Sequence, residues 1–285
     1  MTKEKNKIRK HFFADRLPIL TSILMGGLAM VFVQQGPSLF ELPFASMHLS
    51  FDWIIGIIGL AVFTCLVLLL YKWWFRPEFS GMIPGDLAEA FILSSPVLLY
   101  WIIGTLYGYF FEKDLMTFRM SGQILETSIM AGAAEELCFR GIMISTLLRV
   151  WRKKDAFVKA ALVSSLAFGL THSLNIMNGA NPVRTGSQVL SSFFLGIFFS
   201  AVFIRFGSII PPMAIHAVHD IIALATAVDV SESGVIQGGF SFGVIIDLVL
   251  CILMGLYGLY LLRRSKNDDM HRIWDDKWAG DIYKL

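Results

Sequence analysis

The stretch Ala134-Glu135-Glu136-Leu137-Cys138-Phe139-Arg140-Gly141, near the middle of the chain, constrains how the rest of the chain folds. It places two adjacent carboxylates and a guanidinium inside a run that otherwise has the composition of a membrane-spanning helix. Each charge near the centre of a bilayer costs about 2.5–3.5 kcal/mol on insertion scales, so such charges pair, face a cavity or take part in chemistry. The stretch therefore predicts a polar site inside a helical membrane protein.

Helical geometry separates the roles of the two glutamates. Glu136 and Arg140 are four residues apart and share a helix face, which suits an ion pair. Glu135 points about 100° away from Glu136. We expect Glu136 and Arg140 to hold each other and Glu135 to be left for water or substrate.

The composition of the whole chain agrees with a membrane protein. Its 285 residues are 55% hydrophobic and only 16% charged, whereas soluble domains carry about 25% charged residues. The apolar runs are long and uninterrupted, which favours helices over an outer-membrane barrel. We therefore predict an all-α fold, a polytopic transmembrane helical bundle. The net charge of +2 comes without a basic stripe, so no nucleic-acid partner is expected.

Hydropathy predicts about eight spans of roughly the 17–25 residues that a bilayer requires. They lie at about residues 17–35, 52–71, 88–110, 122–148, 156–176, 188–206, 209–228 and 240–262. Most basic residues between the spans then fall on one side, and the positive-inside rule makes both termini cytoplasmic. No small-residue cleavage site follows the first apolar run, so we expect this span to be retained.

This arrangement divides the chain into five segments. They are a basic cytoplasmic segment (1–16), spans one to three (17–119), a membrane core (120–228), the last span (229–262) and a polar cytoplasmic tail (263–285). Within the core, residues 178–187 are predicted to form a turn-rich loop, and Pro211 and Pro212 to begin a helix after a tight hairpin. The tail either lies on the membrane surface or is loosely ordered.

Two further polar clusters fall in predicted spans. Phe168 and His172 are four residues apart, so the phenyl ring could brace the imidazole. His216 and Asp220 have the same spacing, and the carboxylate could fix the tautomer of the imidazole. Since polar groups in membranes converge on the bundle interior, Glu135, His172 and His216 are expected to share a wet cavity.

Other polar residues in the spans are interpreted as structural. A lone buried histidine is more often a structural group, and His219 is left out of the site for this reason. Asp247 and Glu126 are expected to form structural hydrogen bonds, or to be protonated in an apolar setting. His172, His216 and the acids are possible metal ligands, but no His-Glu-x-x-His pair occurs. We expect no metal and no cofactor, with zinc left open, and the chain lacks the Gly-x-Ser-x-Gly elbow of serine hydrolases.

Taken in order, the three clusters form the pattern Glu-Glu-x-x-x-Arg, Phe-x-x-x-His and His-x-x-x-Asp. This pattern resembles the CAAX protease and bacteriocin-processing family, also called the CPBP or Abi family, over about residues 120–228. The resemblance implies an intramembrane endopeptidase in which a glutamate activates water. Glu135 would be the general base, and His172 its partner near the water. Glu136, Arg140 and Phe168 would support the site.

The resemblance also implies that His216 and Asp220 bind the scissile carbonyl and the developing oxyanion. The eukaryotic prenyl-protein proteases of the family carry Asn at the last position, and Asp220 donates a hydrogen bond only when protonated. Asp220 therefore either acts on the oxyanion directly or orients His216. Counting residues from the predicted cytoplasmic helix ends places His216 at a shallower level than Glu135 and His172.

The expected partners are the lipid bilayer and a peptide or lipid-anchored protein substrate, in the multi-pass setting of a bacterial plasma membrane. The family implies propeptide or bacteriocin processing, self-immunity, or CAAX-type processing, and the residues do not choose among these roles or indicate an oligomeric state. The alternative is a non-catalytic membrane immunity or regulatory protein that binds a peptide or a membrane partner. A transporter is a third reading, with only the buried charges in its favour.

Overall fold

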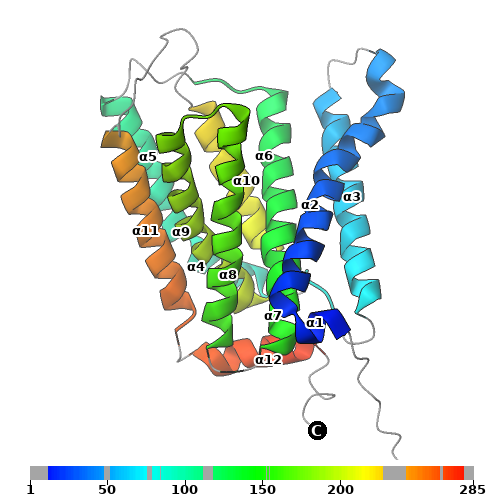
Figure 1. Cartoon of the computed structure of the whole chain (residues 1–285). Helices are drawn as coiled ribbons and strands as arrows, with labels where there is room; N and C mark the ends of the chain where they lie inside the picture. Colours follow the sequence, from blue (N-terminus) through cyan, green and yellow to red (C-terminus); the bar gives the residue numbers. More distant parts are fainter. Residues whose placement is uncertain are drawn as a thin grey trace, which may run out of the picture.

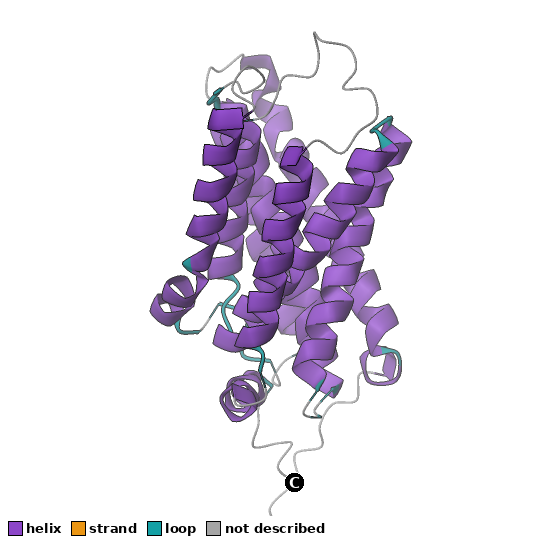
Figure 2. Cartoon of the chain, turned by 90° about the vertical axis from the view of Figure 1, so that its left-hand side faces the viewer, coloured by secondary structure: helices purple, strands orange, loops and turns teal. Residues whose placement is uncertain are grey.

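Regular structure is helical wherever this computed structural model describes the chain, which is at residues 12–47, 52–75, 79–83, 85–111, 118–151, 153, 155–226, 242–263 and 266–278. Long helices run side by side, up and down along the bundle axis (Figures 1 and 2). The predicted all-helical fold is therefore confirmed over these ranges. The basic residues before Phe12, the start of the predicted segment 229–262 and the tail beyond residue 278 lie outside them.

The described helical segments follow one another along the chain. In chain order they are α1 (Phe12–Arg16), α2 (Pro18–Glu41), η1 (Leu42–Met47), α3 (Asp52–Trp74), α4 (Leu87–Ser94), α5 (Pro96–Phe111), α6 (Gly122–Glu135), η2 (Glu136–Ile144), α7 (Ser145–Val150), α8 (Ala156–Thr171), η3 (His172–Asn178), α9 (Pro182–Phe206), α10 (Ile210–Ala225), α11 (Phe242–Leu261) and α12 (Asn267–Lys277). Of these, η2 is a π-helix, and η1 and η3 are 3₁₀-helices. The first and last helices, α1 and α12, lie at the same end of the bundle (Figure 1).

Among the described residues, six segments are long and apolar enough to cross a membrane. They are Pro18–Phe44, Trp53–Trp74, Leu87–Phe111, Ala156–Met177, Pro182–Phe206 and Phe242–Leu261. Each corresponds to one predicted span. The other two predicted spans correspond to the charged run α6–η2–α7 and to α10, a shorter apolar helix. The predicted number of eight crossings stays a prediction.

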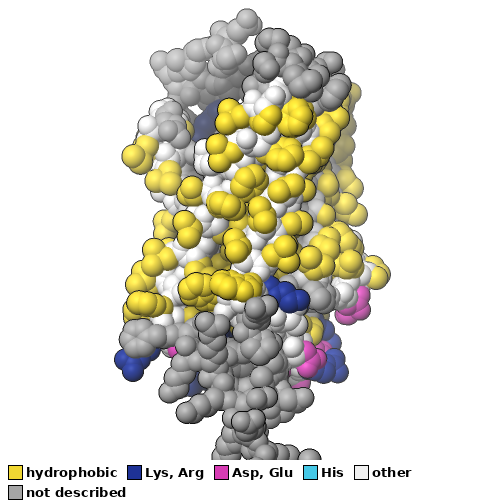
Figure 3. Space-filling view, turned by 90° about the vertical axis from the view of Figure 1, so that its right-hand side faces the viewer, with side chains coloured by type: hydrophobic (Ala, Val, Ile, Leu, Met, Phe, Trp, Pro, Cys, Tyr) yellow, Lys and Arg dark blue, Asp and Glu magenta, His cyan; other side chains and the backbone are white. Residues whose placement is uncertain are grey.

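The outer surface of the bundle is apolar over most of its height. Large apolar side chains such as Leu28, Leu69, Leu99 and Phe110 are more than half exposed. Figure 3 shows apolar side chains over the middle of one face, with charged ones gathered mainly toward the lower end. Such an extended apolar surface suits contact with lipid, because soluble monomers rarely expose large apolar patches.

The structure corrects the predicted loop at 178–187, because α9 already begins at Pro182. The Asn181 side chain accepts hydrogen bonds from the backbone N–H groups of Val183 and Arg184, and Pro182 occupies the first helical position. At the other end, α9 is capped by Gly207, whose φ is positive at 73°. Two residues then lead into α10, so the predicted tight hairpin with its prolines at the helix start is present.

The described part of the carboxyl-terminal tail is a helix rather than a loose segment. Helix α12 lies across the lower end of the bundle (Figure 1). The indole N–H of Trp274 donates to the backbone oxygen of Ile204 at 2.9 Å. Trp278 packs edge-on against Phe75, with ring centroids 5.3 Å apart. The Lys277 ammonium donates to the Gly81 carbonyl at 3.0 Å. These contacts attach α12 to α9 and to the connection that follows α3.

Candidate active site

The site is built around η2, the π-helical segment that interrupts the helix from Gly122 to Val150. All nine residues of η2 are buried. A π-helical turn leaves the usual helical hydrogen-bonding pattern and is frequent at functional sites. Here the hydroxyl of Ser164 on α8 donates to the backbone oxygen of Phe139 at 2.6 Å, which supports the altered backbone. Residues 136–141 of the motif therefore lie on the π-helix, and Glu135 is the last residue of the regular helix α6.

The ion pair that the spacing predicts is present inside the bundle. Nη1 of Arg140 lies 2.9 Å from Oε1 of Glu136, and both side chains are fully buried. The guanidinium also lies over the ring of Phe168, 4.3 Å from its centroid, and 5.5 Å from that of Phe199. A charge buried in this way is tolerated when a partner charge and polarisable faces surround it.

Glycine makes room for this cluster on α9. A Cβ at Gly196 would lie 3.0 Å from Nη2 of Arg140 and 3.2 Å from the ring of Phe168. A second glycine, Gly132, sets the distance between α6 and α10. Its Cβ would lie 2.8 Å from the backbone nitrogen of Ala217 and from the backbone oxygen of Met213. Small residues let helix backbones approach closely in membrane bundles.

That close approach brings His216 of α10 against the motif. Nδ1 of His216 lies 2.7 Å from Oε1 of Glu136, and the imidazole stacks on Phe199 with centroids 5.1 Å apart. The expectation that Asp220 fixes the tautomer of His216 is therefore corrected. Glu136 holds the ring at Nδ1, while Asp220 Oδ2 lies 3.7 Å from Nε2, beyond hydrogen-bond distance.

Glu135 and Asp220 are the carboxylates of the site that reach its surface. Their side chains are 16% and 26% exposed, whereas Glu136 is fully buried. Glu135 Oε2 lies 3.8 Å from Nε2 of His216. Glu135 is thus excluded from the Glu136–Arg140 pair, as its helical position predicts, and faces the free nitrogen of the imidazole. The predicted difference in depth between His216 and Glu135 is absent.

His172 joins the cluster through an aromatic contact. It begins η3 directly after α8, and its ring packs edge-on against Phe168 with centroids 5.1 Å apart. Phe168 also packs edge-on against His216 at 5.9 Å, so one ring contacts both imidazoles and Arg140. Nε2 of His172 is buried and has no hydrogen-bond partner among the described residues. The described protein groups therefore leave this imidazole nitrogen without a hydrogen bond.

Sequence reasoning missed Phe199, Gly196 and Gly132, although each shapes the site. Phe199 is one of many phenylalanines in the spans, and no motif separates it from the others. The three-residue spacing of Gly196 and Phe199 does place both on one face of α9. For Gly132, the sequence signal is only that a small residue lies one helical turn before Glu135 and Glu136.

Among the described residues, no group of three or more His, Cys, Asp or Glu side chains is arranged to hold a metal ion. A metal-free site stays a prediction.

The fold and the site together define a class: a multi-pass helical membrane protein whose interior holds carboxylates, imidazoles and a guanidinium. Residues 117–222 match the family model for type II CAAX prenyl endopeptidase Rce1-like proteins, so this part of the chain is an Rce1-like domain. The match covers a little over a third of the chain and confirms the resemblance seen in the motifs. It contains Glu135, Glu136, Arg140, Phe168, His172, His216 and Asp220. No curated protein and no protein of solved structure matches the chain.

Proposed function

We propose that the protein is an intramembrane endopeptidase that hydrolyses a peptide bond with water activated by Glu135. The Rce1-like domain supports a membrane endopeptidase. The observation that carries the glutamate mechanism is the unequal placement of the two adjacent carboxylates. Glu136 is fully buried and bonded to both Arg140 and His216, while Glu135 is partly exposed beside the imidazole.

In this mechanism Glu135 takes a proton from water, and the resulting hydroxide attacks the scissile carbonyl carbon. The carbonyl oxygen becomes an oxyanion, the C–N bond breaks, and the proton passes from Glu135 to the leaving amine. His172 binds the attacking water through its buried Nε2. This assignment is supported by the lack of any other hydrogen-bond partner for that nitrogen among the described side chains.

His216 and Asp220 are proposed to bind the substrate carbonyl. In this proposal Glu136 is ionised beside Arg140 and only accepts hydrogen bonds, so His216 would carry a proton on Nδ1. Nε2 then faces Glu135 and Asp220. An imidazole that also carries a proton on Nε2, or a protonated Asp220, would donate to the oxyanion. Donors of this kind contribute about 3–4 kcal/mol to stabilisation of the transition state.

We propose a bacterial plasma membrane as the setting and eight crossings, with α6–η2–α7 and α10 added to the six apolar segments. Both termini would be cytoplasmic, which is supported by the shared end of α1 and α12 in Figure 1. A cysteine introduced at Ser187 should then react with an impermeant reagent added to intact cells, and one at Lys153 should not. Reaction at both positions would contradict this topology.

The substrate is proposed to be a membrane-associated peptide, in the form of a secreted propeptide, a bacteriocin precursor or a lipid-anchored tail. Purified protein in lipid nanodiscs should cleave one of these classes, as detected by mass spectrometry of candidate propeptides and prenylated peptides. Glu135→Gln should lower the rate by about 10²–10⁴-fold, because it removes the base while keeping the side-chain shape. Glu89→Gln, an exposed glutamate on α4, is the matched control and should keep the wild-type rate.

A metal chelator completes this experiment. Cleavage that survives the chelator and disappears in Glu135→Gln supports the proposal. Cleavage that disappears with chelator and returns with zinc would instead assign His172 and His216 as metal ligands. Full cleavage by Glu135→Gln would overturn the glutamate mechanism.

A further inference from the structure

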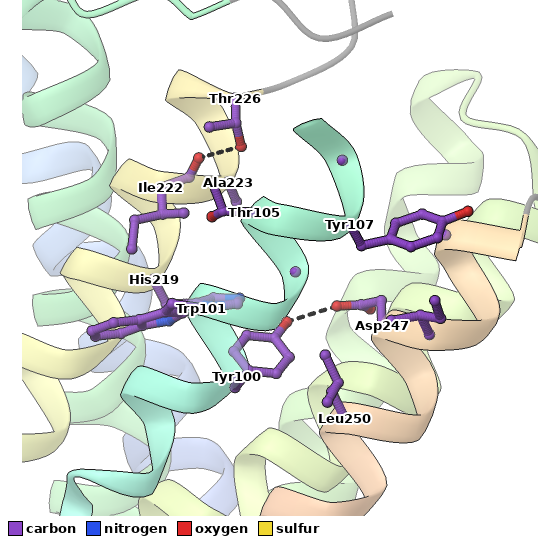
Figure 4. A pocket seen from close by; sticks show the side chains of 14 residues that line it. Tyr100, Trp101, Thr105, Tyr107, His219, Ile222, Ala223, Thr226, Asp247 and Leu250 are labelled. Atoms are coloured by element: carbon purple, nitrogen blue, oxygen red, sulfur yellow. Dashed lines mark hydrogen bonds between the residues drawn. The ribbon is translucent and has the colours of Figure 1, made fainter. Parts of the chain in front are cut away.

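A cavity lies on the side of α10 next to the candidate active site, between α5, α10 and α11. Its volume is about 230 Å³, and Figure 4 shows side chains from all three helices around it. His219 of α10 lines this cavity, whereas His216, Asp220 and Glu135 do not. On a helix, His219 lies about 60° around the axis from His216. The two sites therefore occupy neighbouring faces of one helix.

Among the described residues that line the cavity, one is acidic, Asp247. Its Oδ1 accepts a hydrogen bond from the Tyr100 hydroxyl at 2.6 Å, and its Oδ2 accepts one from the Ser191 hydroxyl at 3.0 Å. Both donors are neutral, and the described lining of the cavity includes no lysine or arginine. No ion pair of Asp247 is found among the described residues. Two hydroxyl donors hold the carboxyl group of Asp247 in place, and no Lys or Arg lines the described part of the cavity beside it.

Aromatic residues also line the cavity. They are Tyr100, Trp101 and Tyr107 of α5, and Figure 4 shows Tyr100 directed at Asp247 and Trp101 beside His219. The Trp101 indole N–H donates to Nδ1 of His219 at 3.3 Å, which makes that imidazole an acceptor there. Tyr100 and His219 also pack with ring centroids 5.4 Å apart. The indole and the imidazole therefore hold each other in position.

We propose that this cavity binds an organic cation, through an ammonium or guanidinium group placed between Asp247 and the aromatic rings. Ring faces attract cations through their quadrupole, most strongly where water is excluded, and a fixed carboxylate supplies the opposite charge. Aromatic cages of this composition recognise ammonium ligands in other proteins. The proposal concerns binding alone and does not depend on peptidase activity.

Binding of choline and of agmatine, which carry a quaternary ammonium and a guanidinium, tests the proposal. Equilibrium dialysis of the purified full-length protein in phosphatidylglycerol nanodiscs should show saturable binding of at least one of them. The neutral isostere 3,3-dimethyl-1-butanol should compete poorly with choline. Addition of phosphatidylcholine to the nanodiscs should displace choline if a lipid headgroup is the natural source of the cation, and should leave its binding unchanged if the source is a free amine.

Two variants separate the cavity from adsorption elsewhere. Asp247→Asn removes the charge while keeping oxygen that can accept from Tyr100, and should weaken cation binding by about tenfold or more. Gly104→Leu should abolish binding, because Gly104 lines the cavity and nothing lies within 4 Å of a Cβ at this position. Gly27 on α2 likewise has nothing within 4 Å of an added Cβ, so the control variant Gly27→Leu should bind the cations as the wild-type protein does.

The outcome is decided by these comparisons. Loss of binding in Gly104→Leu, with normal thermal stability and with binding retained in Gly27→Leu, supports the cavity even if Asp247→Asn fails to fold. Absence of saturable binding of both probes to the wild-type protein would overturn the proposal. Equal binding by wild type, Gly104→Leu and a folded Asp247→Asn would also overturn it.

Discussion

Oε1 of Glu136 joins two helices, because it lies 2.9 Å from Nη1 of Arg140 and 2.7 Å from Nδ1 of His216. The arginine is on the same segment as Glu136, and the histidine comes from α10. One carboxylate oxygen therefore connects the buried charge pair to the imidazole and fixes which ring nitrogen faces Glu135. The orientation of His216 depends on Glu136 rather than on Asp220.

Glu136→Gln is expected to damage the fold as well as the site. The variant strands Arg140 as a fully buried cation, and loss of one partner of a buried ion pair typically costs about 3–5 kcal/mol. We therefore expect low membrane abundance and a lower melting temperature, measured by thermal unfolding in detergent. In any folded variant that remains, the hydrogen bond between residue 136 and Nδ1 of His216 should be weaker.

The adjacent variant Glu135→Gln is the control for this prediction. Glu135 lies outside the ion pair and is partly exposed, so its abundance and melting temperature should stay near those of wild type. Equal losses of stability in the two variants would contradict the assignment of separate roles to the two glutamates.

Gly196→Ala is expected to destabilise the protein although alanine is the better helix former. The added methyl group would lie 3.0 Å from Nη2 of Arg140 and 3.1 Å from Cβ of Ser165, so the packed guanidinium must move. Overpacking of this kind typically costs about 1–3 kcal/mol. Gly186→Ala, on the same helix, meets nothing within 4 Å and should gain up to about 1 kcal/mol. Opposite shifts in melting temperature would support this packing, and a stabilised Gly196→Ala would contradict it.

The sequence predicts the helical fold and the members of the site because both depend on local patterns. Long apolar runs define the helices, and four-residue spacing places Glu136 beside Arg140 and Phe168 beside His172. The helix start at Pro182 escapes prediction because Gly179, Asn181, Pro182 and Gly186 are typical turn residues, whereas Asn181 caps the helix there. The order of α12 was missed because its stability comes from Trp274 and Trp278 packing on distant helices.

The relative depth of His216 also depends on tertiary contacts. Counting from the membrane surface assumes that neighbouring helices begin at one level. The residues just before α10 are instead covered by other segments. The N–H of Ile209 donates to the backbone oxygen of Met82 at 2.9 Å, and Gly207 packs against α12. These contacts join segments far apart in the sequence, so no local pattern reports them.

Gly132→Ala is expected to separate α6 from α10. The new Cβ would lie 2.8 Å from backbone atoms of Ala217 and Met213, which cannot rotate away as a side chain can. The bond between Glu136 and His216 should lengthen, and the melting temperature should fall by an amount that corresponds to about 1–3 kcal/mol. Gly27→Ala, with open space around it, is the control and should not lose stability. A stable Gly132→Ala protein with wild-type cleavage would show that the close approach is not required.

Lys277, which lies on α12 outside the membrane helices, is expected to make the stability of the protein depend on pH. Burial lowers the pKa of Lys277 from 10.5 to about 8. Below pH 8 the ammonium is charged in both states, and the folded protein bears the cost of burying it. Between about pH 8 and 10.5 the unfolded chain binds more protons than the folded protein, so the free energy of unfolding rises with pH. The gain is at most about 3 kcal/mol, from the size of the pKa difference.

Lys277→Met isolates this contribution. The variant has no titrating group at this position but also loses the hydrogen bond to the Gly81 carbonyl, so its absolute stability is not the informative quantity. The informative quantity is the difference in melting temperature between wild type and Lys277→Met, measured at pH 7 and at pH 9.5. Other titrating groups shift both proteins alike and cancel in this difference. Wild type should gain relative to the variant at the higher pH, because its lysine is then neutral when folded. A difference that stays constant would mean that Lys277 remains charged in the folded protein, with its ammonium reaching water past α12.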